Sequence, residues 1–106
     1  GNYNKGNLNL RRGDYRSACR YYRGQDTYNA TLASILYGNN NSTCSENTAA
    51  CYYLNAIAGA RSGNTTMLFK NLEKAIQESD MYKNESLKDL EFLNYRDHEK
   101  FISLTK

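Results

Sequence analysis

The chain has no proline and no tryptophan, and it carries only one histidine and three cysteines in 106 residues. Proline interrupts helices, so its absence permits uninterrupted ones. An odd number of cysteines excludes a framework in which every cysteine is paired within the chain. No apolar run approaches the roughly 20 residues that a transmembrane helix requires. These absences favour a helical chain without a transmembrane segment.

Catalytic and metal-binding signatures are also missing. His98 stands between Asp97 and Glu99, but adjacent residues do not face one another on a helix, so they form no catalytic dyad. Ser-His-Asp, paired-carboxylate and phosphate-loop patterns do not occur, and no CxxC spacing is present to hold a metal ion. We therefore expect a protein that is not an enzyme, with no cofactor and no metal.

The most informative feature is a repeat with a period of 25 residues. It relates three glycines, the tyrosine ten residues before each glycine, and the Asp or Asn directly after it. These positions are Gly13, Gly38 and Gly63; Tyr3, Tyr28 and Tyr53; and Asp14, Asn39 and Asn64. A fixed period of this size is typical of repeat arrays, in which each repeat buries its apolar face against its neighbours.

Each repeat is expected to be a helix, a tight turn and a second helix. Glycine adopts positive φ without steric cost and so suits the end of a helix, and the Asp or Asn after it can cap the next one. Apolar residues keep helical spacing before each glycine, as in Tyr28, Leu32 and Ile35. Nothing alternates with a period of two for long. The pattern predicts an all-α fold.

One segment matches a known family at several positions, namely Gly6, Gly13, Asp14, Tyr15, Ala18 and Tyr22. It resembles a tetratricopeptide repeat (TPR), which has a small residue in its first helix, a Gly-Asp-Tyr turn, and an Ala followed four residues later by an aromatic residue in its second helix. The third repeat matches more loosely, through Ala56, Gly63, Asn64, Leu68 and Leu72. The resemblance covers about residues 2–80.

The resemblance implies a single TPR-like α-solenoid domain over residues 1–106, with three helix-turn-helix repeats at about 2–25, 26–46 and 47–80. The family period is about 34 residues, so the second helices must be short here. The second helix of the second repeat, Asn40 to Asn47, is very polar and could be a single turn. We expect capping helices over 84–106, one opened by Ser86 and another capped by Asp97. The chain also looks like the C-terminal end of a larger bacterial TPR protein, packed on upstream repeats.

Cys19 and Cys44 occupy equivalent repeat positions, which favours buried, free thiols. A disulfide between Cys44 and Cys51 is the alternative if the protein is exported. The compartment stays open between the cytoplasm and the bacterial periplasm or envelope.

In the resembled family, the first helices line a groove that binds a partner. Carried over to this chain, the groove residues are Asn4, Asn7, Arg11, Asn29, Leu36, Leu54 and Arg61. Some family members grip a terminal carboxylate there, but Gln25, Ala50 and Leu54 stand where the clamp requires other side chains. We therefore expect a scaffold module that binds a protein or peptide segment of another kind. The alternative is a structural end of a longer solenoid with no ligand of its own.

Charge is unevenly distributed. Residues 1–25 hold six basic residues and one acidic residue, a net charge of +5, and four of the arginines follow helical spacing: Arg12, Arg16, Arg20 and Arg23. This stripe could be a solvated helix face, a docking surface for a preceding repeat, or a binding site for an anionic partner such as nucleic acid or acidic lipid. The overall charge of +3 is low for a nucleic-acid-binding protein.

Overall fold

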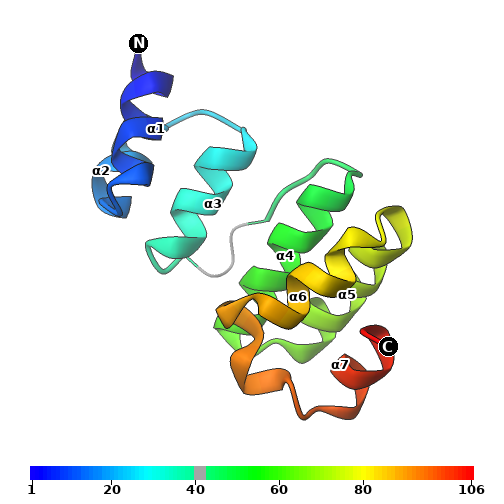
Figure 1. Ribbon diagram of the computed structural model, residues 1–106. Helices are drawn as coiled ribbons and strands as arrows, with labels where there is room; N and C mark the ends of the chain where they lie inside the picture. The colour runs from blue at the N-terminus through cyan, green and yellow to red at the C-terminus, as the bar shows by residue number, and fades with distance from the viewer. Residues whose placement is uncertain (40–42) are drawn as a thin grey trace. The chain divides into compact units, whose positions relative to one another are not determined.

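The computed structural model describes residues 1–39 and 43–106, and every regular element within them is helical (Figure 1). The prediction of an all-α fold is confirmed for these residues. The chain divides into two compact units, an N-terminal unit of Gly1–Cys44 and a C-terminal unit of Ser45–Lys106. Each unit has its own packed helices and is described separately.

The N-terminal unit consists of α1 (Asn2–Arg11), α2 (Tyr15–Tyr21) and α3 (Tyr28–Leu36). Gly13 turns the chain between α1 and α2 with a φ of +78°. The Asp14 side chain then caps α2 by accepting a hydrogen bond from the Ser17 backbone N–H at 3.1 Å. Thr27 caps α3 in the same way, through the backbone N–H of Ala30. The turn and the Asp14 cap agree with the sequence prediction.

The core of this unit is centred on Tyr22, which packs with Ala18 and Ala33. The Tyr22 ring lies against Gly6 of α1, and a Cβ atom at Gly6 would overlap the ring. The missing side chain of Gly6 therefore allows α1 to approach the end of α2. This contact fixes the spacing of the helices that carry the candidate site.

The C-terminal unit is built on the antiparallel pair α4 (Ala49–Ser62) and α5 (Thr65–Glu78), visible in Figure 1. Gly63 ends α4 in the left-handed conformation with a φ of +72°, and Asn64 caps α5 by accepting from the backbone N–H of Met67. At Gly59 the two helix backbones come so close that a Cβ atom would lie 2.5 Å from the backbone nitrogen of Leu68. The closeness of the two helices gives α4 an almost continuous buried segment.

Three short elements cover this pair: α6 (Met81–Lys88), the 3-10 helix η1 (Leu90–Tyr95) and α7 (Glu99–Leu104). The side chains of Phe92 and Phe101 are fully buried. Tyr53 on α4 donates a hydrogen bond to Asp89 Oδ2 at 2.7 Å, and Tyr95 donates one to the backbone oxygen of Ala60 at 3.1 Å. Buried aromatic rings and these polar contacts together hold η1 against the end of α4.

Of the expected three helix pairs, the described part of the chain contains two, α1–α2 and α4–α5, together with the helix α3. Gly38 has the predicted positive φ, +112°, but residues 43–48 form no helix after it. Residues 40–42 of the expected helix lie outside the described residues. The reason is visible in the composition of Thr43 to Thr48, which offers no apolar stripe to bury.

Two expected helix starts near the C-terminus are also wrong. Ser86 does not open a helix but lies inside α6, where its hydroxyl donates to the Lys83 backbone oxygen. The cap of α7 is His98 rather than Asp97, because His98 Nδ1 accepts from the Lys100 backbone N–H.

Candidate functional site

Four of the predicted groove residues line one pocket of the N-terminal unit. Asn4, Asn7 and Arg11 lie on one face of α1 at the helical spacing i, i+3 and i+7, and Asn29 lies on α3. With Leu10 they surround a volume of about 510 Å³. We call this site the amide pocket, because three of its five residues are asparagines.

Asn7 is at the centre of a hydrogen-bond network. Its Oδ1 accepts from the hydroxyl of Tyr22 and from Asn29 Nδ2, the latter at 3.1 Å. Burial raises the pKa of Tyr22, the nearby Tyr3 raises it further, and the Asn29 side chain acts in the opposite direction. The phenol therefore stays protonated and acts as the donor. Since the Asn7 oxygen accepts twice, its amide N–H₂ group is oriented and available to donate.

Asn4 and Arg11 occupy the exposed rim of the amide pocket. Among the described residues, neither side chain has a hydrogen-bond or ion-pair partner within the unit. The N-terminal unit carries six basic and two acidic residues, which gives it a net charge of +4. The pocket thus combines fixed amides, one apolar side chain and an unneutralised guanidinium group. Such a set can bind peptide groups and a carboxylate, but it holds no general acid or base.

The remaining predicted groove residues lie elsewhere. Leu36 is half-buried in the last turn of α3 and does not line the amide pocket. Leu54 of α4 is completely buried, so the expectation that it contacts a partner is wrong. The repeat spacing gives the position of Leu54 on its helix, but it does not show that α5 and η1 pack on α4.

Arg61 is engaged inside the C-terminal unit. Its Nε donates to Glu91 Oε1 at 2.6 Å and its Nη2 to Glu91 Oε2 at 2.7 Å, a two-pronged ion pair between α4 and η1. Glu91 cannot be recognised as the partner of Arg61 from sequence spacing, because the two residues are 30 positions apart. Arg61 therefore connects α4 to η1 within the C-terminal unit.

The arginine stripe is not one helix face. Arg12 is the C-terminal cap of α1, and Arg23 follows the end of α2, so only Arg16 and Arg20 lie within that helix. Three of the four nevertheless line one pocket of about 410 Å³. We call it the arginine pocket; its residues are Arg16, Cys19, Arg20, Arg23 and Tyr37.

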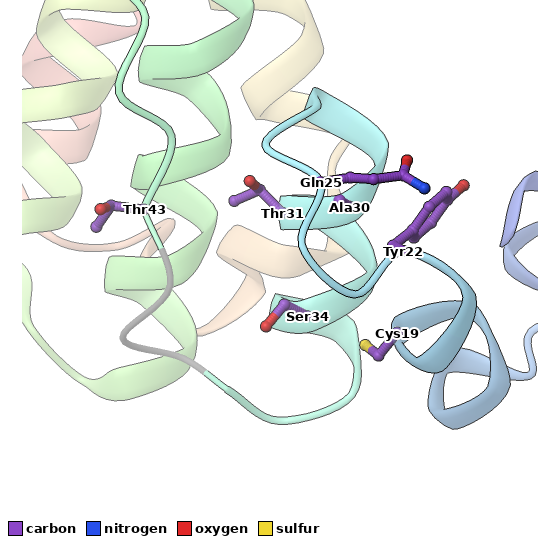
Figure 2. Close-up of a pocket in the computed structure, with 7 residues that line it drawn as sticks. All are labelled: Cys19, Tyr22, Gln25, Ala30, Thr31, Ser34 and Thr43. Atoms are coloured by element: carbon purple, nitrogen blue, oxygen red, sulfur yellow. The ribbon is translucent and has the colours of Figure 1, made fainter. Parts of the chain in front are cut away.

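A third pocket, of about 320 Å³, lies between α2 and α3 and is lined by Cys19, Tyr22, Gln25, Ala30, Thr31, Ser34 and Thr43 (Figure 2). Figure 2 shows the side chains of Thr31 and Ser34 projecting from α3 on the side of Thr43. No charged residue lines it, and burial raises the pKa of the Cys19 thiol. A neutral thiol is a weaker nucleophile than a thiolate, so Cys19 is not activated in the described lining of this pocket.

The cysteines correct one expectation. Cys44 and Cys51 are disulfide-bonded, whereas Cys19 is free and half-buried. The prediction that Cys44 keeps a buried free thiol is therefore wrong. Its equivalence to Cys19 in the repeat was misleading, because no second helix follows α3 in residues 43–48 to place Cys44 on a packing face.

His98 has a structural position. Its ring packs on Phe69 with centroids 4.7 Å apart, and its Nδ1 caps α7. In residues 1–39 and 43–106, no cluster of three or more His, Cys, Asp or Glu side chains is arranged to hold a metal ion. Within the same ranges, no helix combines the length and the apolarity that crossing a bilayer demands.

Comparison of the chain with protein-family models, with curated proteins and with solved structures finds no match.

Sequence reasoning missed two pocket residues, Leu10 and Tyr37. Leu10 lies three residues after Asn7 on α1, so helical spacing would have placed it beside the amides. Tyr37 directly precedes Gly38, and an exposed aromatic residue at a helix end is the signal that could have indicated it.

Proposed function

We propose that this chain is a short TPR-like helical array that acts as a protein-interaction module and binds an extended partner segment in the amide pocket. The observation that carries the proposal is the convergence of Asn4, Asn7, Arg11 and Asn29 on one site. These residues come from two helices, α1 and α3, and their sequence positions correspond to the groove of the resembled family.

The chemistry of the amide pocket specifies the kind of segment. Asparagine side chains can pair with the N–H and C=O groups of an extended backbone, as they carry both a donor and an acceptor. Arg11 suits an Asp or Glu side chain, and Leu10 offers apolar contact. The net charge of +4 on this unit would speed the association of acidic segments. We therefore expect an acidic segment with an aliphatic residue near its acid.

The TPR-like assignment is supported by three local features. Glycines with positive φ separate the helices of both pairs, at Gly13 and Gly63. Asp14 and Asn64 cap the second helix of each pair. Gly6 accommodates the Tyr22 ring, the type of contact that the small and aromatic positions of the family would make. The described residues 43–48 form no helix after α3, which makes the array a degenerate one.

A second candidate function is structural. The fully buried rings of Phe92 and Phe101 attach η1 and α7 to the α4–α5 pair, and α6 packs on α5. A solenoid requires such a cover at its end. In this interpretation the C-terminal unit closes a longer array, and the amide pocket has no ligand.

The disulfide-bonded state of Cys44 and Cys51 favours an oxidising compartment. Of the two compartments considered, the bacterial periplasm or envelope fits this state better than the cytoplasm.

The test is to select binders from a displayed library of random peptides on the immobilised protein. The strongest peptides are then measured against the variants Asn4→Ala and Arg11→Ala. We expect selected peptides to be rich in Asp and Glu and to lose about tenfold in affinity with either variant, the scale of one charge-assisted hydrogen bond.

Arg12→Ala is the matched control, because Arg12 is adjacent, equally charged and exposed but does not line the pocket. The affinity of Arg12→Ala for the selected peptides should stay within about twofold of that of the unaltered protein. If Arg12→Ala weakens binding as much as Arg11→Ala, the peptides respond to the net charge of the protein and not to the pocket. The pocket proposal then fails. If no peptide is enriched, the structural role takes its place.

A further inference from the structure

The arginine pocket is lined by three arginines, and the nearby Asp14 compensates only part of their charge. Arg16 and Arg20 lie one helical turn apart on α2, and Arg23 follows the helix end. Among the described residues, no carboxylate lies within ion-pair distance of these three guanidinium groups. Like charges that line one concave site repel each other, so an anion placed between them would lower the free energy of the unit.

Asp14 is the acidic side chain that interacts electrostatically with Arg20 and Arg16. Asp14 accepts the Ser17 backbone N–H at the start of α2, and this hydrogen bond is the main reason why its pKa is lowered, with smaller contributions from Arg20 and Arg16. The Cys19 thiol in the pocket wall is neutral, because burial raises its pKa. The ionised Asp14 therefore offsets part of the positive charge of Arg20 and Arg16, whereas the neutral thiol adds no charge to the pocket.

The pocket also holds one aromatic ring. Tyr37, at the end of α3, is 50% exposed and lines the same concavity as the arginines. Exposed aromatic rings beside guanidinium groups can stack on planar ligands, and nucleobases are the common biological ligands that join a planar ring to a phosphate. A volume of about 410 Å³ lies within the range of small-molecule sites.

We propose that the arginine pocket binds a mononucleotide, with its phosphate on Arg16, Arg20 and Arg23 and its base on Tyr37. The site is separate from the amide pocket, with which it shares no residue. The proposal is therefore independent of peptide binding.

The form of the pocket favours a mononucleotide over larger anionic partners. A single-stranded nucleic acid requires a groove that follows several phosphates and a series of stacking rings, whereas this pocket offers one ring. A membrane surface requires a cluster of basic residues accompanied by exposed apolar side chains, whereas this pocket is concave and its lining contains three arginines, a thiol and a phenol.

Isothermal titration calorimetry at low salt tests the proposal with four ligands: AMP, adenosine, ribose 5-phosphate and inorganic phosphate. AMP should bind at least about fivefold more tightly than ribose 5-phosphate, the low end of one stacking contact. Tyr37→Leu should reduce AMP binding to the level of ribose 5-phosphate and leave ribose 5-phosphate unchanged. The double variant Arg20→Gln/Arg23→Gln should weaken AMP by about tenfold or more.

Arg12→Gln is again the matched control, since it removes the same charge outside the pocket, and it should change AMP binding by less than about twofold. Circular dichroism on every variant confirms that the helices are retained. Equal affinity for AMP and ribose 5-phosphate, equal loss with Arg12→Gln, or no AMP binding at millimolar concentration would each overturn the proposal. An oligonucleotide that binds more tightly with each added nucleotide would replace it with a polymer site.

Discussion

At the scale of single residues, three glycines turn the chain at helix ends in a backbone conformation that other residues rarely adopt. Gly13, Gly38 and Gly63 all have positive φ, as their place before Asp or Asn indicated. Exposure was less predictable, because it depends on what distant segments cover. Leu54 was assigned to an open groove and is fully buried, since residues far along the chain pack over α4.

The contact between Gly6 and Tyr22 gives a stability prediction. Gly6→Ala should lower the free energy of unfolding by about 1–3 kcal/mol, because the added methyl group overlaps a ring that is only 2% exposed and has little room to move. Urea denaturation followed by circular dichroism measures the change.

The control for this contact is the same change in a Tyr22→Leu background. The smaller side chain should relieve the overlap, so the penalty of Gly6→Ala should fall by at least about half. An undiminished penalty would show that the cost does not arise from the ring.

The helix cap at Asp14 gives a prediction of pH dependence. The hydrogen bond from the Ser17 N–H lowers the pKa of Asp14 below its ordinary value of 3.8. The folded state therefore favours the ionised form. The stability from this cap is present above about pH 4 and is lost as the pH falls through the folded pKa.

Asp14→Asn keeps a good capping side chain that does not titrate. Thermal melts of both proteins between about pH 6 and pH 2.5 should show that the advantage of the wild type over Asp14→Asn shrinks with acid. A difference that stays constant over this range would contradict the assignment of the cap to the ionised Asp14.

At the scale of elements, the sequence indicated helices well where an apolar stripe and a cap coincide, as in α4 and α5. The prediction of a helix was wrong where a capping residue occurred without an apolar stripe beside it. Asn39 has the capping position of its repeat, but its side chain donates to Ser34 Oγ, and residues 43–48 form no helix. Ser86 has the sequence spacing of a helix start, yet it is a buried residue inside α6, which continues to Lys88.

The attachment of η1 to α4 should depend in part on Arg61 and Glu91. A double-mutant cycle with Arg61→Gln and Glu91→Gln should give a coupling of about 0.5–1 kcal/mol, because the pair is two-pronged but partly exposed. The side chains are 32% and 24% exposed. Molar salt should reduce the coupling, since it screens exposed charges. A coupling near zero at low salt would mean that the buried rings and the hydrogen bonds of Tyr53 and Tyr95 hold η1 without a contribution from this ion pair.

At the scale of the whole molecule, the 25-residue period predicts turns at equal spacing in three repeats, but burial is unequal between the two units. Most of the fully buried side chains belong to the C-terminal unit, among them Leu54, Leu68, Leu72, Phe92 and Phe101. The core of the N-terminal unit is small and is centred on Tyr22. Periodicity in a sequence reports where turns recur, and it does not report how much surface each repeat buries.

This inequality predicts a hierarchy of amide hydrogen exchange. Backbone amides in the middle of α4 and α5 should exchange at least about tenfold more slowly than those of α1 and α2, because opening them exposes more apolar surface. Exchange measured by mass spectrometry on peptic fragments resolves these helices. Equal protection in both pairs would contradict the distribution of burial.

The central claim is that the amide pocket of the N-terminal unit binds a partner segment. The most direct measurement is a two-dimensional ¹H–¹⁵N NMR titration of the labelled protein with an acidic peptide selected on it. We expect the largest shifts at the side-chain amides of Asn4, Asn7 and Asn29 and at Arg11 Nε, with Arg12 Nε little changed. Shifts confined to the C-terminal unit, or equal shifts at Arg11 and Arg12, would contradict the claim.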